Sequence, residues 1–303
     1  MKRLSTFSRN ILLLFSLFLS GSCASANTVS EIILVGSTPG DEEIKSALKI
    51  PANTKIDFIK WNLKLAENNN FTIDIHFGIS QPNTMGFIND GEKRTISGTF
   101  TVSKNQNNGK FKQVYDLKSD GFLENLSFAK LTENVFHILT SQNNLMIGNG
   151  GWSYSLNRKN PVDSEDVMVS SSVSDEKSLQ MIFDGRTPCQ IFAVDHPEMK
   201  VSDQCIKLKW RLILNRDATT YLPTTYTIRK IVDGRAQMIT GKWTIIKGTT
   251  KNPDAIIYQI EPDKAEESIS FLVGDDNVLF FLNKNSEPYF GNENFSFAMN
   301  KKL

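Results

Sequence analysis

The sequence is short of the residues from which most catalytic and metal sites are built. It contains three histidines and three cysteines in 303 residues, and the histidines, His76, His137 and His196, stand in unrelated contexts. No H-x-H, H-E-x-x-H or G-x-S-x-G element accompanies them. The Asp and Glu residues are scattered and form no pair that could be assigned as acid and base. We therefore expect a protein that is not an enzyme and that carries no metal and no cofactor.

An excess of either charge is also missing. Lys and Arg number 34 against 33 Asp and Glu, for a formal net charge of +1. A nucleic-acid partner would require a marked positive excess, so we expect none. Beyond the N-terminus, no apolar run approaches the roughly 20 residues that a membrane-spanning helix needs.

The N-terminus has the pattern of a secretory signal peptide. Residues 1–26 begin with basic side chains, continue with an apolar run at 11–19 and end in small residues. Two cleavage sites remain open: Ser20-Gly-Ser-Cys23 is similar to a lipobox with a lipid on Cys23, and Ala24-Ser-Ala26 is an A-x-A site with cleavage after Ala26. We expect an extracytoplasmic chain of a bacterial cell envelope, lipid-anchored at the outer membrane or periplasmic, or alternatively secreted. A lipid on Cys23 would be its one contact with a membrane.

Two cysteines remain after export. Cys189 and Cys205 have neither the C-x-x-C spacing of redox sites nor a zinc-binding pattern. An oxidising compartment would pair them. We predict a structural disulfide that stabilises the fold by about 3 kcal/mol.

Apolar and polar residues alternate over much of the chain. Ile59, Trp61, Leu63 and Leu65 alternate with polar residues, and so do the apolar residues of 71–77. This period predicts antiparallel strands with one face on a core and one in water. Before them, a short strand at 30–35 ends at Gly36, and a helix at 41–49 is capped by Asp41 and plugs one end of the sheet. Further strands are predicted at 95–103, 111–118, 134–140 and 152–158.

The second half of the chain repeats the first. Gly36-Ser-Thr-Pro matches Gly185-Arg-Thr-Pro, and Lys60-Trp61 matches Lys209-Trp210, without a gap between the two motifs. Later motifs match at one slightly shorter spacing, which predicts a single length change between about Ala66 and Asp90. These pairs are Gly98 with Gly241, Tyr115 with Tyr258, Ser127 with Ser270 and Asn157 with Asn300.

This duplication predicts two tandem domains. The first covers residues 30–158 and the second 180–303, and a Ser- and Asp-rich linker at 159–179 joins them. Under the same alignment Cys189 falls on Gly40 and Cys205 on Ile56. The first copy therefore lacks both halves of the disulfide together, as expected of a bridge gained or lost as a unit.

Four aromatic residues fall on the predicted inward faces of the strands: Trp61, Phe100, Trp210 and Trp243. Core filling is the default role for such residues. They are also the candidate ligand-facing residues, because the interior of a small barrel can itself be a pocket.

The order of motifs in the second copy resembles the N-terminal domain of NlpE-type envelope lipoproteins, a copper-resistance and surface-sensing family. The resemblance rests on Gly185-Arg-Thr-Pro-Cys189, Leu208-Lys-Trp-Arg-Leu-Ile-Leu214 and Thr240-Gly-Lys-Trp243. It implies a small lipocalin-like β-barrel in the cell envelope. That family places a second cysteine three residues after the first, where this chain has Phe192, so copper handling is not carried over.

These observations predict an all-β protein of two tandem small antiparallel lipocalin-like β-barrels, each with a short helix or loop plug after its first strand. Closure would protect the sheet edges. We expect a non-enzymatic envelope protein with a binding or sensing role, whose partner is an unknown envelope protein. The alternative is a lipocalin-like carrier of a small hydrophobic ligand in a barrel lumen.

Overall fold

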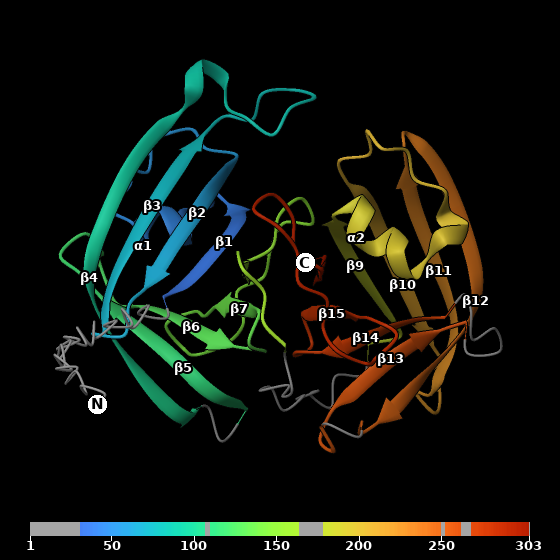
Figure 1. The fold of residues 1–303 in the computed structure, drawn as a ribbon. Helices are drawn as coiled ribbons and strands as arrows, with labels where there is room; N and C mark the ends of the chain where they lie inside the picture. Colours follow the sequence, from blue (N-terminus) through green and yellow to red (C-terminus); the bar gives the residue numbers. More distant parts are fainter. Residues whose placement is uncertain (1–30, 107–109, 164–177, 250–251, 262–267, 303) are drawn as a thin grey trace, which may run out of the picture.

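The structure, a computed structural model, describes residues 31–106, 110–163, 178–249, 252–261 and 268–302. The predicted signal peptide with Cys23 and Ala26, and most of the predicted linker, lie outside these residues. The chain forms two closed antiparallel barrels that lie side by side (Figure 1). Within the described part of the chain, no helix has the length and apolar character needed to cross a bilayer.

The first barrel runs from β1 to β8 and the second from β9 to β16. The elements of the first are β1 (Ile32–Pro39), α1 (Glu42–Ala47), β2 (Phe58–Leu65), β3 (Asn70–Gly78), η1 (Ile88–Asp90), β4 (Glu92–Gln106), β5 (Phe111–Lys118), β6 (Leu126–Lys130), β7 (Val135–Ile138) and β8 (Ser155–Arg158). Those of the second are β9 (Gln180–Thr187), α2 (Cys189–Asp195), η2 (Pro197–Met199), β10 (Leu208–Arg216), β11 (Pro223–Val232), β12 (Arg235–Lys247), β13 (Ile256–Ile260), β14 (Ile269–Val273), β15 (Val278–Leu282) and β16 (Ala298–Lys301).

Each barrel is an up-and-down meander. Every strand pairs antiparallel with the next, and the last strand closes onto the first through Val35↔Asn157 in one copy and Asp184↔Asn300 in the other. The predicted fold class is therefore confirmed. Strand β6 was not predicted, because Leu126, Phe128 and Ala129 are all buried and the sequence does not alternate there. Ala129 belongs to a cluster between the barrels, so the outer face of this strand is covered as well.

The predicted end of the first strand at Gly36 is wrong, because β1 continues to Pro39. Gly36 lies where β1 crosses the last strand, and a Cβ there would stand 2.9 Å from the carbonyl oxygen of Ser155. Its match Gly185 lies under the last strand of the second copy, 2.8 Å from the carbonyl oxygen of Ala298 by the same measure. The shared glycine therefore marks the place where the first and last strands of one barrel cross closely, rather than a turn.

A short helix follows the first strand in both copies, as predicted. Asp41 caps α1 by accepting a hydrogen bond from the backbone N–H of Ile44 at 3.2 Å. Ile44 and Leu48 then enter the core of the first barrel. In the second copy α2 places Cys189 and Phe192 in the core in the same way.

The interiors of both barrels are filled with side chains. One buried cluster draws residues from all of β1 to β8 and from α1, and a second draws on β9 to β16 and α2. A third cluster joins the barrels, with Phe111, Val135 and Leu139 on one side and Val278 and Phe280 on the other. The two barrels thus share an apolar interface as well as a linker.

The interface has an approximate twofold symmetry. The Gly148 N–H donates to Oδ1 of Asn300 at 2.7 Å, and its match, the Gly291 N–H, donates to Oδ1 of Asn157 at 2.6 Å. The hydroxyl of Ser153 bonds that of Ser296, which is its own match in the repeat. Matched residues that touch each other must lie on a symmetry axis, so the copies pack as two subunits of a C2 dimer do.

The predicted single length change between the copies is wrong. The β2–β3 connection is longer in the second copy, at 217–222 against 66–69. The β3–β4 connection is much longer in the first copy, at 79–91 against 233–234. The two changes partly cancel, which is why the sequence shows them as one small net change in spacing.

Candidate functional site

A cavity of about 520 Å³ lies on the outer face of the first barrel, where that barrel meets the second. We call it the seam cavity. Its volume falls in the roughly 300–1,000 Å³ range of small-molecule sites. The residues that border it are Val35, Lys60, Trp61, Asn62, Asp74, Ile75, His76, Lys93, Arg94, Thr95, Lys159 and Glu293.

Strand register explains how these residues come together. One row across the sheet pairs Lys60 with His76 and His76 with Lys93. The next outward row pairs Val35 with Asn62, Asn62 with Asp74 and Asp74 with Thr95. Side chains of a strand alternate between its faces, so these polar residues point outward while Trp61 and Ile75 point into the core.

The second copy closes the cavity. Glu293 comes from the connection between β15 and β16, and its backbone carbonyl accepts a hydrogen bond from the Ser37 hydroxyl at 2.7 Å. The neighbouring carbonyl of Asn292 accepts from Nδ2 of Asn157 at 3.2 Å. The second copy therefore contributes Glu293 to the border of the cavity.

The cationic residues that line the cavity are Lys60, Lys93, Arg94 and Lys159. The Lys60 side chain has no hydrogen-bond or ion-pair partner among the described residues, and partial burial lowers the pKa of its ammonium group, which Glu293 opposes. Lys159 follows β8 and is exposed at the rim. Lys93 differs, because its ammonium group lies 2.9 Å from the Asp90 carboxylate. Lys60 and Lys159 are therefore the two cavity lysines that have no ion-pair partner among the described residues.

The inner surface of the seam cavity carries hydrogen-bond acceptors. Oδ1 of Asn62 is buried and has no hydrogen-bond partner in the described structure. Asp74 beside it accepts a hydrogen bond from the Thr95 hydroxyl at 2.7 Å. A buried polar atom without a partner is destabilising unless a ligand or water satisfies it, so Asn62 marks a position where a donor is expected.

A row of aromatic rings extends from His76 away from the cavity. The ring of His76 lies 4.5 Å from that of Phe87, Phe87 stacks on Phe58 at 4.3 Å, and Phe58 stacks on Trp152 at 4.7 Å. Nε2 of His76 donates to the backbone carbonyl of Asp90 at 2.5 Å, which fixes the ring. Phe87 and Asp90 belong to the long 79–91 connection, which is much shorter in the second copy, so the insertion positions the His76 ring.

The equivalent surface of the second copy is occupied by an ion pair. Val35 and Asn62 correspond to Asp184 and Arg211, whose side chains form two hydrogen bonds of 2.7 Å. Gly150, the match of Glu293, packs so closely that a Cβ there would stand 2.6 Å from that of Asp184. The same place in the fold is therefore hollow in one copy and filled in the other.

The four candidate ligand-facing residues lie in the barrel cores. Trp61, Phe100, Trp210 and Trp243 are between 2 % and 7 % exposed. The indole N–H of Trp61 donates to the Thr38 hydroxyl at 2.8 Å, and that of Trp210 to the matched Thr187 at 2.9 Å. Trp61 also borders the seam cavity.

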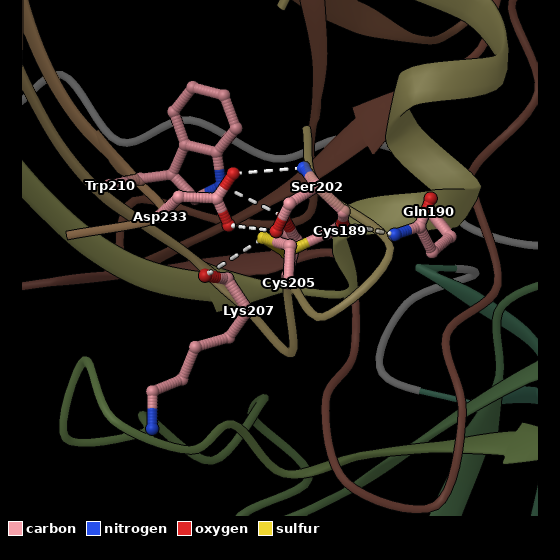
Figure 2. The surroundings of a disulfide bond; sticks show 8 residues. Cys189, Gln190, Ser202, Cys205, Lys207, Trp210 and Asp233 are labelled. Carbon is pink, nitrogen blue, oxygen red and sulfur yellow. Dashed lines mark hydrogen bonds between the residues drawn. A yellow bond between two sulfur atoms is a disulfide. The ribbon is translucent and has the colours of Figure 1, made fainter. Parts of the chain in front are cut away.

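The disulfide joins Cys189 and Cys205 as predicted, with 5.9 Å between their Cα atoms (Figure 2). It ties the start of α2 to the segment before β10. In the first copy a Cβ on Gly40 would stand 2.4 Å from Cγ2 of Ile56. The isoleucine thus occupies the place of the bridge, so the alignment of Cys189 with Gly40 and Cys205 with Ile56 holds in space.

The loop that the disulfide closes is fastened at two further points. Asp233 accepts from both the backbone N–H and the hydroxyl of Ser202, at 2.8 and 2.9 Å (Figure 2). Nε2 of Gln190 donates to the carbonyl of Ser202 at 2.8 Å. These bonds hold the plug of the second copy to its barrel.

The three histidines stay apart. His137 is fully buried, bonds the Ser155 hydroxyl and the Met146 carbonyl, and packs edge-on against Phe280, and burial lowers its pKa to about 4. His196 stacks on Phe192, and burial lowers its pKa as well. Across the described segments, no three His, Cys, Asp or Glu side chains are placed to hold a metal ion.

The sequence predicted that Lys60, Asn62, Asp74 and His76 would face outward but gave no signal that they line a cavity. That depends on Glu293, which lies far along the chain, and on the docking of the second copy. Comparisons with protein-family models, with curated proteins and with solved structures return no match. The fold alone therefore defines the class of the protein, a tandem of two closed eight-stranded antiparallel barrels.

Proposed function

We propose that this chain is an exported, non-enzymatic binding protein of the bacterial cell envelope, with a binding or sensing role of the kind that its resemblance to NlpE-type lipoproteins implies. The site we assign to this role is the seam cavity. The observation that carries the proposal is the unpaired Lys60 and Asn62 inside a cavity of ligand size.

Three further features support it. The disulfide is typical of chains that leave the cytosol, in agreement with the predicted signal peptide. Most of the cavity's lining lies on the paired strands β1 to β4, as a preformed binding site requires. The lining combines apolar side chains with charged and polar groups that can orient a ligand.

The alternative, a carrier of a hydrophobic ligand in a barrel lumen, has less support. Trp61, Phe100, Trp210 and Trp243 each pack into a core that draws on every strand of its barrel. A ligand in that space would have to displace side chains from a closely packed interior.

One double variant separates the two functions. Val35→Asp with Asn62→Arg imports the ion pair of the second copy and fills the seam cavity while leaving both cores untouched. Small molecules extracted from bacterial envelopes should raise the melting temperature of the wild-type chain and leave that of the variant unchanged. An equal rise in both proteins would refute the seam cavity as the site and favour a lumen.

A further inference from the structure

The two copies differ in the chemistry of one matched surface, and that difference indicates what the seam cavity binds. In the second copy the Arg211 guanidinium is neutralised by Asp184. In the first copy Val35 and Asn62 stand in their place, so both charges of that pair are absent and the cavity has Asp74 and Glu293 as its carboxylates. Lys60 remains, as Lys209 does in the second copy, but it is half-buried where Lys209 is exposed.

The uncompensated cations favour an anionic group in the ligand. Lys60 borders the cavity from β2 and Lys159 from the residue after β8. Neither side chain has a hydrogen-bond partner among the described residues. The carboxylate that acts on Lys60 is that of the exposed Glu293, which forms no ion pair with it. Charge-assisted hydrogen bonds to such a group are among the stronger ones that proteins make.

The acceptors on the inner surface of the cavity favour hydroxyl groups on the same ligand. Oδ1 of Asn62 is buried and unsatisfied, and the Asp74 carboxylate beside it accepts a hydrogen bond from the Thr95 hydroxyl. Both oxygens can accept only, so they select for O–H or N–H groups. A simple inorganic anion would leave them without partners.

We propose that the seam cavity binds a hydroxylated organic carboxylate of the sugar-acid class, with its carboxylate on Lys60 and Lys159 and its hydroxyls on Asn62 and Asp74. This rests on the proposed function and adds the chemistry of the ligand. The His76 ring, held in place by Phe87 behind it, borders the cavity and supplies a surface for the apolar face of a sugar ring.

The test uses D-glucuronate as the probe and isothermal titration calorimetry on the full mature chain. D-glucose lacks the carboxylate, and acetate lacks the hydroxyls. We expect glucuronate to bind, and glucose and acetate to bind at least about tenfold more weakly, since each loses one set of hydrogen bonds. Equal binding of glucose or of acetate would overturn the assignment.

The repeat supplies a matched control variant. Lys60→Ala should weaken glucuronate binding by about tenfold or more, and Lys209→Ala, at the matched exposed position, should leave it unchanged. Equal losses would indicate a nonspecific effect of charge and would contradict the site. A loss with Lys60→Ala alone, in a variant that keeps the wild-type melting temperature, supports it.

The outcomes also separate this inference from the proposed function. If glucuronate does not bind, but envelope small molecules still stabilise the wild-type chain and not the cavity-filled variant, the ligand class is wrong and the binding function stands. If neither stabilises the wild-type chain, both proposals fail.

Discussion

The two copies hold their plug helices in different ways. In the first copy the Tyr154 hydroxyl donates to the Asp41 carboxylate at the start of α1. In the second the Tyr289 hydroxyl donates to Asp195 at the end of α2, and a disulfide is added. Tyr154 and Tyr289 are not matched in the repeat. Both copies therefore hold the plug helix in place, but they do so with different residues.

The same contrast governs the outer surface. The copy with the disulfide fills its surface with the Asp184–Arg211 ion pair, and the copy without it carries the seam cavity. The first copy therefore lacks an ion pair at the surface where the second copy has one. The second barrel has the features of a scaffold, with its loop at Glu293 completing a site on the first.

The largest expected effect concerns the disulfide. Replacing Cys189 and Cys205 by Ser should lower the free energy of unfolding by about 3 kcal/mol, because the loop between them is no longer closed in the unfolded chain. Amide exchange followed by mass spectrometry should show faster exchange in α2 and β10, with α1 and β2 unchanged. Equal acceleration in both copies would contradict a bridge that serves the second copy alone.

A pH effect of similar size should come from His137, whose match is Phe280. Burial lowers its pKa to about 4 in the folded chain, against about 6.5 when unfolded. As pH falls from about 6.5 to 4, the unfolded chain gains a proton that the folded chain does not. Stability should therefore fall over this window, by at most about 3 kcal/mol.

The matched variant for this test is His137→Phe, which copies the residue of the second barrel. Chemical denaturation at a series of pH values should show a smaller loss of stability between pH 6.5 and 4 in this variant than in the wild type. The variant starts from a lower stability, since Ser155 and Met146 lose a hydrogen-bond partner, but the slope is the readout. An unchanged slope would rule out His137 as the titrating group.

A smaller effect should test the twofold symmetry. Asn157→Ala and Asn300→Ala each leave a buried glycine N–H without its acceptor, and each should cost about 2 kcal/mol. The account predicts a loss for both variants in urea unfolding, the larger one for Asn157→Ala, which also removes the Nδ2 bond to the Asn292 carbonyl. A large loss for one and none for the other would show that the interface is not symmetric in energy.

The smallest expected effect concerns the tyrosine anchors. Tyr154→Phe and Tyr289→Phe each remove one hydroxyl that donates to a carboxylate, at a cost of about 1–2 kcal/mol. The loss with Tyr289→Phe should increase when the disulfide is reduced, because the bridge otherwise holds the same plug. The loss with Tyr154→Phe should not respond to reduction, and a response there would break the comparison.

The sequence was sufficient for the fold because strand alternation, the repeat and the Asp41 cap are local patterns. It was not sufficient at contacts between distant strands of one barrel or between the two barrels. Strand β6 lost its alternation because Ala129 is covered by the second copy, and Gly36 indicated a turn where it serves a crossing of strands. The disulfide could be predicted by elimination of Cys23, whereas the seam cavity depends on docking that no local pattern records.

The most direct test of the central claim is a map of ligand binding by NMR on the full mature chain. Titration with D-glucuronate, or with an envelope small molecule that stabilises the wild-type chain, should shift backbone amides at 60–62, 74–76 and 93–95. The matched amides at 209–211, 229–231 and 236–238 should stay in place. Shifts in the second set alone, or around Trp210 and Trp243 in the core, would contradict a binding site at the seam of the first barrel.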